Sequence, residues 1–414
     1  MGVPALEMGV VGVSLLLAFA AGVIWPHVRQ LYLELLLSLY TALRTLLGLP
    51  PAPEPEPEPA VLEPAVDAPA PKTSPKPPVV VRRAPPAPSP APLYAACGTL
   101  ASHDGWVTAL AFLPDGRLVS GSADATVRVW PAPLAACEPG AEFVLEGHVG
   151  AVRSLVPLQA PVFASPADVC FASAGDDSTV RIWACSPGAA WRCLAVLAGH
   201  GDAVYALVAL PDGALLSAAA DHALRLWRPQ PEGYRCGAAL AGHSDFVLAL
   251  ALCAAPLAAV SAGWDATLRV WEGLGRGGDP ACARVLRGHV GPVRAVAPLP
   301  CGARVVSGGA DGGVRIWRPA TGVCERILVP PGAAPATPAP ILALQSVGAD
   351  TLAVAAEDGS LCVWAIDGSN AQLAAALSGH GKRVYALAAG GMPDALCLAS
   401  GSRDRTVRLW RLST

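Results

Sequence analysis

Lysine and runs of like charge are scarce in this chain of 414 residues. Charged residues make up 15% of it, the formal net charge is −3, and lysine occurs only at positions 72, 76 and 382. Affinity for nucleic acid depends mainly on phosphate contacts made by clustered Lys and Arg side chains. We therefore expect no nucleic-acid partner.

The chain also lacks the local patterns of metal and catalytic sites. Its twelve cysteines form no CxxC pair, and none stands beside a histidine at the spacing of zinc ligands. No Walker loop, HExxH or GxSxG pattern occurs, and no Asn-x-Ser/Thr sequon. We expect no cofactor, no metal and no catalytic residue. Scattered cysteines without sequons favour a reducing compartment, with the thiols acting as small core side chains.

An uncharged apolar run, residues 9–25 (GVVGVSLLLAFAAGVIW), lies near the N-terminus. Its length approaches the ~20 residues that a helix needs to span a bilayer. The arginines that follow, Arg29 and Arg44, favour a cytosolic C-terminal side. We predict a transmembrane signal anchor over 1–25, with a cleaved signal peptide or an organelle-targeting segment as the alternatives.

Residues 26–49 predict a second, amphipathic helix. Pro26 ends or kinks the apolar helix before it. The polar residues that follow recur in steps of 4, 4, 3 and 4, at Gln30, Glu34, Ser38, Thr41 and Thr45. Such steps place them on one helical face, which suits a helix in the membrane interface or one packed against the first helix.

Residues 50–92 are rich in proline and have no apolar periodicity. This composition predicts a disordered, extended linker of polyproline type. Two matches to a basic-x-x-Pro-x-x-Pro pattern, Lys72–Pro78 and Arg82–Pro88, make 72–88 a candidate docking segment for an SH3-type domain. Chance matches are also expected in a stretch with this much proline.

Residues 93–414 contain a unit that recurs seven times. Each unit ends in a tryptophan, and successive tryptophans are 53, 44, 44, 46, 47 and 46 residues apart. An aspartate stands six positions before each tryptophan, and a serine stands ten positions before it in all units but the sixth, which has Val354. A Gly-His pair lies upstream in five units, Ser102-His103 replaces it in the first, and the sixth has no histidine.

These residues resemble the WD-repeat β-propeller family, in which ~40–45 residues form one four-stranded blade. The co-registered Asp and Trp positions cover over three quarters of the chain, although no unit has an aspartate after its tryptophan. The resemblance implies an all-β, seven-bladed WD-repeat β-propeller over 93–414. It also implies that Tyr94–Leu100 joins the strands ending at Trp410 and closes the ring.

His200, Ser217 and Asp221 are the residue types of a hydrolase triad. A triad occurs once in an enzyme and has an exposed nucleophile, whereas this set recurs in nearly every unit. In the family that the chain resembles, His, Ser, Asp and Trp form a buried hydrogen-bonded network within each blade, so we expect a structural role. The network residues expected here are His148, His200, His243, His289, His380, Asp124, Asp177, Asp221, Asp265, Asp311, Asp358, Asp404, Trp130, Trp183, Trp227, Trp271, Trp317, Trp364 and Trp410.

An arginine two positions before the tryptophan recurs in six units, as Arg128, Arg181, Arg225, Arg269, Arg315 and Arg408. It recurs once per unit with an aspartate nearby. We therefore interpret it as a repeated charge partner rather than as a track for nucleic acid.

Positions that differ between the units are the candidates for partner binding. The resemblance places three positions per blade on the partner-facing surface: the two that flank the first valine of the inner strand, and the one before the turn aspartate. Trp, Tyr and Arg dominate interface energetics and are frequent there. The candidate partner-binding residues are Trp106, Arg153, Tyr205, Phe246, Trp264, Arg294, Arg383, Tyr385 and Arg403.

We expect these candidates to gather in two corners, one aromatic and one basic-aromatic. Phe246 and Trp264 would form the first, and Arg383, Tyr385 and Arg403 the second.

Two units depart from the repeat. The second is lengthened by QAPVFASPADV (159–169), which we expect to be a surface loop. The sixth has VPPGAAPATPAP (329–340) in place of Gly-His and lacks the serine, so we expect the least stable blade there.

Together these patterns predict a non-enzymatic scaffold or adaptor that binds protein or peptide partners on the propeller face. It would be anchored in a membrane, most simply an endomembrane, with the propeller facing the cytosol. A substrate receptor of ubiquitin-type or trafficking machinery and an RNA- or ribosome-associated propeller are the alternatives. Similar propellers serve unrelated processes, so the fold does not select among partners.

Overall fold

The computed structural model describes residues 79–81, 94–132, 143–161, 163–254, 257–275, 280–328, 339–348, 350–367, 370–392 and 395–412. All regular secondary structure in these segments is β-strand. None of them holds a helix with the length and apolar character that crossing a membrane requires. The predicted helices over 1–25 and 26–49 lie outside the described residues, as does the linker apart from residues 79–81.

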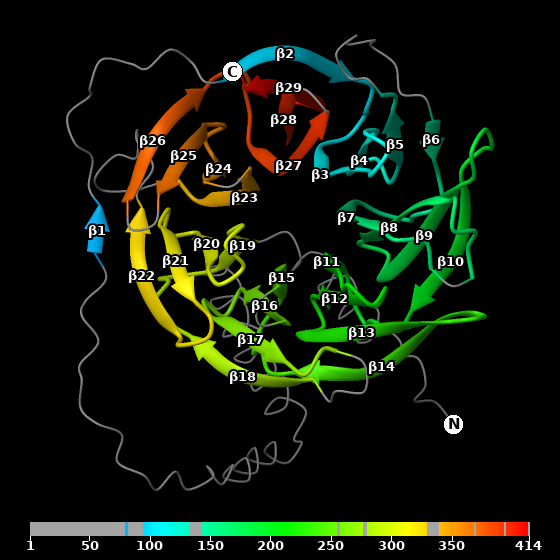
Figure 1. The fold of residues 1–414 in the computed structure, drawn as a ribbon, viewed down its shortest axis with the longest axis horizontal. Helices are drawn as coiled ribbons and strands as arrows, with labels where there is room; N and C mark the ends of the chain where they lie inside the picture. The colour runs from blue at the N-terminus through cyan, green and yellow to red at the C-terminus, as the bar shows by residue number, and fades with distance from the viewer. Residues whose placement is uncertain are drawn as a thin grey trace, which may run out of the picture. The chain divides into compact units, whose positions relative to one another are not determined.

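Seven sheets stand in a ring, and each is one blade (Figure 1). Blade one has β3 (Val107–Phe112), β4 (Leu118–Ser122), β5 (Val127–Trp130) and β6 (Phe143–Leu145). Blade two has β7 (Val152–Leu158), β8 (Val169–Gly175), β9 (Thr179–Cys185) and β10 (Arg192–Ala198). Blade three has β11 (Val204–Ala209), β12 (Leu215–Ala219), β13 (Ala223–Gln230) and β14 (Gly233–Ala241).

The remaining blades repeat this order. Blade four has β15 (Val247–Ala254), β16 (Leu257–Gly263), β17 (Leu268–Glu272) and β18 (Ala281–Leu286). Blade five has β19 (Val293–Pro298), β20 (Val305–Gly309), β21 (Val314–Arg318) and β22 (Val323–Leu328). Blade six has β23 (Ile341–Val347), β24 (Thr351–Ala356), β25 (Leu361–Asp367) and β26 (Asn370–Leu377). Blade seven has β27 (Val384–Met392), β28 (Ala395–Ser402) and β29 (Thr406–Leu412).

The first strand of each blade lies nearest the centre of the ring, and the fourth lies at the rim (Figure 1). The second strands read as short apolar runs, and β12 (LLSAA) is buried along its whole length. The outer strands alternate instead, as β18 (ACARVL) does between exposed and half-buried residues before its buried last residue, Leu286. These patterns are typical of a strand covered on both faces and of an edge strand half in solvent.

The apolar core lies between neighbouring blades. One cluster joins Leu216 and Leu224 of blade three to Val247 and Trp271 of blade four. A Cβ added to Gly308 would lie 2.4 Å from Ile341 of the next blade, so a glycine is needed for this approach. Each blade therefore depends on its neighbours for burial of its faces.

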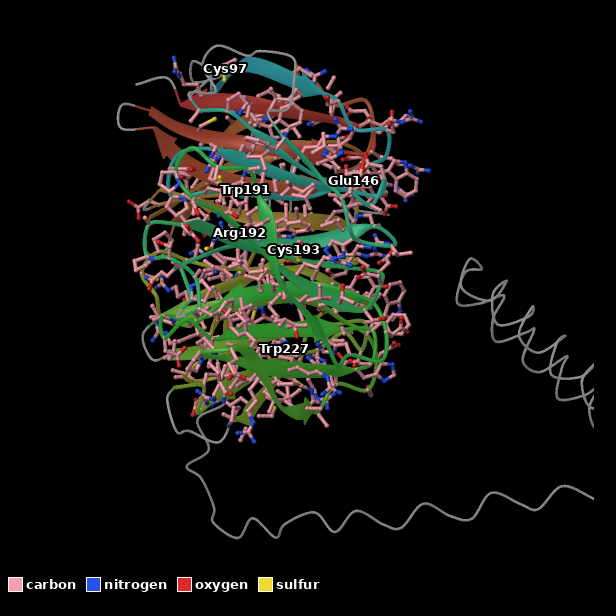
Figure 2. All side chains as sticks on the ribbon, turned by 90° about the vertical axis from the view of Figure 1, so that its right-hand side faces the viewer. Cys97, Glu146, Trp191, Arg192, Cys193 and Trp227 are labelled. Carbon is pink, nitrogen blue, oxygen red and sulfur yellow. The ribbon has the colours of Figure 1, made fainter. Side chains whose placement is uncertain are left out.

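β2 (Tyr94–Ala101) closes the ring (Figure 1), and Cys97 of this strand is labelled at the top of the side view in Figure 2. It pairs antiparallel with β29, with Ala96 opposite Trp410 and Leu100 opposite Val407. Leu100 is buried in the same cluster as Trp130 of blade one. The prediction that Tyr94–Leu100 completes the last blade is confirmed, and both ends of the propeller chain lie in one sheet.

The proline-rich segment contributes one further strand, β1 (Val79–Val81), which pairs in parallel with β22 of blade five. These three residues of the predicted linker over 50–92 form a strand, and the rest of that linker lies outside the described residues. Consecutive β-branched residues favour a strand, and the outer strand of a blade offers an unpaired edge.

The insertion of blade two is a turn-rich connection between β7 and β8, as expected, but it is also held in place. Asp168 is buried and accepts hydrogen bonds from Ser186 Oγ at 2.7 Å and from Arg192 Nη2 at 2.8 Å. The ring of Phe163 meets that of Tyr234 in blade three at a centroid distance of 5.5 Å. This loop therefore braces blade two against blade three.

Candidate partner-binding site

Six of the seven blades contain the same chain of hydrogen bonds. In blade three, Trp227 Nε1 donates to Ser217 Oγ at 2.8 Å, His200 Nε2 lies 2.6 Å from Ser217 Oγ, and His200 Nδ1 lies 2.8 Å from Asp221 Oδ2. Blades one, two, four, five and seven repeat these three contacts at 2.6–3.0 Å. In blade one the histidine is His103, which follows a serine instead of a glycine.

The hydrogen bonds of this chain fit a neutral imidazole. With His200 neutral, its Nδ1–H donates to the Asp221 carboxylate and its Nε2 accepts the Ser217 hydroxyl proton, while Ser217 Oγ accepts the indole N–H. Burial lowers the pKa of His200, and Asp221 offsets only part of that effect. Ser217 has 0% exposed surface, so no substrate reaches its hydroxyl, and the arrangement is that of a scaffold.

Asp221 also ties the turn between β12 and β13 to the loop before β11. Its Oδ1 accepts the Ala223 N–H at 3.2 Å, and its Oδ2 accepts the Gly201 N–H at 3.0 Å. Burial opposes ionisation of Asp221, but the bonds from Gly201 and His200 outweigh it and lower the pKa of the carboxyl. These hydrogen bonds therefore hold in place the loops that carry the candidate residues.

The recurrent arginine lies against the Gly-His pair. A Cβ added to Gly147 would stand 2.8 Å from Arg181 Nη1, so the glycine leaves the space that the guanidinium fills. In the described residues, Arg315 is the one of the six arginines that forms an ion pair with its own blade's aspartate, Asp311, at 3.4 Å. The predicted charge partnership is therefore wrong for the other five.

A β-bulge sets one of the three candidate positions in every blade. Each inner strand pairs with its neighbour through a register shift that skips the residue after its first position. A bulge leaves the skipped residue unpaired and turns its side chain away from the regular pleat. The bulged residues, all half-buried, are Thr108, Arg153, Tyr205, Leu248, Arg294, Leu342 and Tyr385.

A backbone hydrogen bond holds the other two candidate positions of each blade together. The N–H of the residue before the turn aspartate donates to the carbonyl of the residue before the inner strand. Trp264 donates to Phe246 at 2.8 Å, Arg403 donates to Arg383 at 2.9 Å, and the other five blades have the same bond. We call the face formed by these three positions of all seven blades the mouth.

One aromatic cluster joins blades one and seven at the mouth. Trp106 stacks on Tyr385 with ring centroids 6.1 Å apart and an interplanar angle of 21°. The Arg403 guanidinium lies 4.3 Å from the centroid of the Trp106 ring, within the range of a cation–π interaction. Trp106 is 39% exposed, so aromatic surface remains for a partner.

A second cluster joins blades two and three. Arg153 lies 5.8 Å from the ring centroid of Tyr205 and donates two hydrogen bonds of 2.7 Å to Asp176. Burial raises the pKa of Tyr205, so the phenol stays protonated as a donor.

The third cluster joins blades three, four and five. Phe246 and Trp264 meet edge to face with ring centroids 6.3 Å apart. Arg294 of blade five lies 5.2 Å from the Trp264 ring centroid, and His222 of blade three lies 5.7 Å from that of Phe246. Arginine and aromatic side chains thus meet across three of the boundaries between blades.

The structure confirms the expected aromatic corner of Phe246 and Trp264 but groups the residues of the basic-aromatic corner differently. Arg383 does not join Tyr385 and Arg403 but forms an ion pair of 2.5 Å with Glu357 of blade six. The sequence did not predict the contact of His222 with Phe246, because His222 follows the turn aspartate and is not one of the three candidate positions of its blade.

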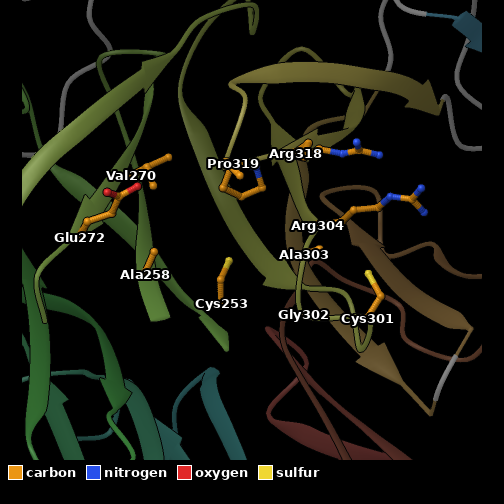
Figure 3. A pocket seen from close by; sticks show the side chains of 11 residues that line it. Cys253, Ala258, Val270, Glu272, Cys301, Gly302, Ala303, Arg304, Arg318 and Pro319 are labelled. Atoms are coloured by element: carbon orange, nitrogen blue, oxygen red, sulfur yellow. The ribbon is translucent and has the colours of Figure 1, made fainter. Parts of the chain in front are cut away.

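A separate pocket of about 380 Å³ lies on the opposite face, between blades four and five (Figure 3). Buried Cys253 and Val270 line its blade-four side, and burial raises the pKa of Cys253 to about 11. On the blade-five side, Arg304 and Arg318 both contact Glu325, at 2.9 and 2.6 Å. Both guanidinium groups are already engaged by this one carboxylate, so we place the candidate site at the mouth.

Comparison with known families identifies the repeat. The family model described as "WD domain, G-beta repeat" matches residues 95–131, 141–184, 191–228, 234–272, 280–318 and 371–411, which together make more than half of the chain. The matches leave out residues 319–370, which hold most of blade six.

Several known proteins match part of the chain. Nuclear distribution protein PAC1 of Arthroderma otae is 30% identical over 149 residues, covering 33% of this chain and 32% of that protein. Nuclear distribution protein nudF of Aspergillus flavus is 32% identical over 132 residues, covering 31% and 26%. Striatin-3 of Homo sapiens is 34% identical over 151 residues, covering 32% and 18%. The match spans about a third or less of each relative.

Proposed function

Because the chain belongs to the WD-repeat β-propeller family, we propose that it is a non-enzymatic scaffold or adaptor that binds protein or peptide partners at the mouth. One observation carries the proposal. A bulge occurs at the same backbone position in every blade, and the residue at that position differs between neighbouring blades. Arginine and aromatic side chains gathered on one face are typical of binding hot spots.

The proposal includes attachment to a membrane through residues 9–25, with the propeller in the cytosol and an endomembrane as the site of attachment. Its support is the uncharged apolar run and the arginines that follow it. Docking of an SH3-type domain on 72–88 rests on the pattern of basic residues and prolines alone.

The similar proteins do little to identify the partner. Their names, nuclear distribution protein and striatin, point to different proteins, and propellers with one scaffold serve many processes. The names therefore select no partner, which has to be found by experiment.

Proximity labelling with the full-length chain in cells tests the mouth. We compare the natural sequence with Trp264→Ala/Arg403→Ala, which changes two different clusters, and expect a defined set of labelled proteins to be lost. The matched control is Val196→Ala/Val285→Ala, which truncates two exposed side chains on the outer strands β10 and β18. Identical labelling by the mouth variant and the natural chain would reject the proposal.

The same experiment with residues 1–49 deleted tests the membrane attachment separately. We expect membrane-protein neighbours to disappear and the neighbours that depend on the mouth to remain. Membrane neighbours that persist after the deletion would contradict attachment through this segment.

A further inference from the structure

We infer that the outer edge of blade five is a strand-docking site, with Val79–Val81 as its resident occupant and an extended, β-branched partner segment as the ligand it fits. β1 pairs in parallel with β22, with Val79 opposite Arg326, Val80 opposite Ile327 and Val81 opposite Leu328. The other strand pairs of blade five are antiparallel. β1 is therefore an addition to the repeat and not one of its strands.

The edge is available because β22 is the fourth strand of its sheet. Its inner side pairs with β21, and its outer side presents a row of backbone N–H and C=O groups that a further strand satisfies. Among the described strands, the outer strands β6, β10, β14, β18 and β26 end their sheets, and blade five alone has five strands (Figure 1). The addition is thus specific to this blade.

The triplet that β1 faces, Arg326, Ile327 and Leu328, does not set blade five apart by itself. Its equivalents in blade four, aligned by pairing with the third strand, are the similar Arg284, Val285 and Leu286. The segment that reaches the edge of β22, a run of three residues with high strand propensity, therefore distinguishes blade five.

The length of the chain sets the second condition. Residues 82–93 join β1 to β2 of blade seven, and thirteen Cα-to-Cα steps span at most about 45 Å. This short connection keeps the effective concentration of the valines at the edge high, on the order of millimolar.

The docked strand is short enough to exchange. It makes three residue pairs, in the parallel arrangement, which is the weaker one per residue. The gain from each hydrogen bond is similar in size to the entropy lost in ordering each residue. A partner segment with several consecutive β-branched residues therefore competes for the edge by adding itself as a strand.

This site is separate from the mouth. β22 is the outermost strand of its blade, whereas the mouth is formed at the start of the inner strands and at the turns after the second strands. The inference therefore does not rest on the function proposed above.

Hydrogen exchange of the full-length protein, read by mass spectrometry, tests the resident strand. Val80→Pro removes a backbone N–H and disfavours regular pairing, so we expect the segment Val323–Leu328 to lose protection at the amides that face β1, within Arg326–Leu328, which should exchange about tenfold faster or more. Val80→Thr keeps a β-branched residue and should retain the protection. The outer strand of blade four, Ala281–Leu286, is the internal control and should not change.

A peptide added in trans tests the ligand class. The probe is KPPVVVRRA, residues 76–84 of this chain, added at millimolar concentration to the Val80→Pro variant. We expect protection of Val323–Leu328 to return, and a peptide with proline in place of its central valine to have no effect.

Three results would overturn the inference: equal exchange in the natural chain and Val80→Pro, no recovery with the valine peptide, or a gain of protection on adding the peptide that is as large at Ala281–Leu286. A Trp264→Ala/Arg403→Ala protein should keep the protection of β22. Failure of the mouth proposal and failure of this one are therefore distinguishable.

Discussion

Blades three and six have the same four antiparallel strands, but only blade three contains the hydrogen-bonded network. In blade three the indole N–H of Trp227 reaches Ser217, which has 0% exposed surface. In blade six Val354 occupies the position of that serine, and the buried Trp364 Nε1 has no hydrogen-bond partner. A buried donor without a partner costs free energy, so it lowers the stability of blade six.

The strand register is nonetheless the same in both blades. Val354 lies opposite Cys362 in blade six, as Ser217 lies opposite Arg225 in blade three. The alternating apolar pattern is therefore sufficient to form a blade. The network adds rigidity to a sheet that burial has already assembled.

The changes in blade six occur together for a steric reason. In the five blades that have a Gly-His pair, the arginine packs against its glycine, as Arg181 does against Gly147. Blade six has neither Gly-His nor the arginine, whose position is taken by Cys362. Without the arginine, no guanidinium needs the space that the glycine leaves.

The largest expected difference between the two blades is in replacement of the tryptophan. Trp227→Ala should lower the free energy of unfolding by about 3–5 kcal/mol, because it opens a cavity between blades and leaves Ser217 without its donor. Trp364→Ala should cost about 1 kcal/mol less, because no hydrogen bond is lost there. Denaturant unfolding measures both, and equal costs would show that the network adds nothing at the tryptophan.

Removal of the serine should come next in size. Ser217→Ala leaves the Trp227 N–H and His200 without their shared partner, at an expected cost of about 2–3 kcal/mol. Hydrogen exchange should place the added opening in β11–β14. A cost below about 0.5 kcal/mol would mean that water replaces the hydroxyl.

A smaller difference in stability between blades three and six is expected in acid. Burial lowers the pKa of His148, His200, His243 and His380 in the folded state. The unfolded chain then binds more protons, so stability is fully present above the ordinary histidine pKa of about 6.5 and declines as pH falls below it. The lowered pKa of Asp221 acts in the same direction at lower pH, with its stabilisation lost as pH falls below about 4.

Exchange measured at pH 7 and pH 5.5, corrected for the intrinsic rates, checks this pH dependence. Blade three should lose protection in acid, and blade six, which has no histidine, should lose less. The same loss in both blades would contradict the assignment of neutral histidines to the network.

The smallest effect is expected from repair of blade six. Val354→Thr keeps the shape of the side chain and supplies an oxygen for Trp364 Nε1, so stability should change by less than about 1 kcal/mol and in the favourable direction. The control is Val260→Thr in blade four, a buried site on the equivalent strand, where we expect a loss of about 1–3 kcal/mol. Equal losses at both sites would show that the orphaned indole N–H does not matter.

Most of the propeller could be predicted because its signals are local and repeat. The aspartate and tryptophan of each unit stand six residues apart, and the turn and third strand between them follow from that spacing. The pairing of Arg383 with Glu357 could not be predicted, since a charged residue exposed in a loop has several carboxylates within reach. The strand at Val79–Val81 was hidden by its composition, because prolines surround three valines in a segment without periodicity.

By itself the sequence determined the number of blades, the strand that closes the ring and the residue at each position of the mouth. These depend on periodicity within units of about 45 residues, where side-chain spacing decides which face is buried. Only the tertiary structure decided that Trp106 meets Tyr385 and Arg403, and that β1 lies on β22. Those contacts join segments far apart in the chain. The contacts of Trp106 exist because closing the ring brings the first blade against the last. β1 lies on β22 because the outer strand of a blade has an edge that another strand can pair with.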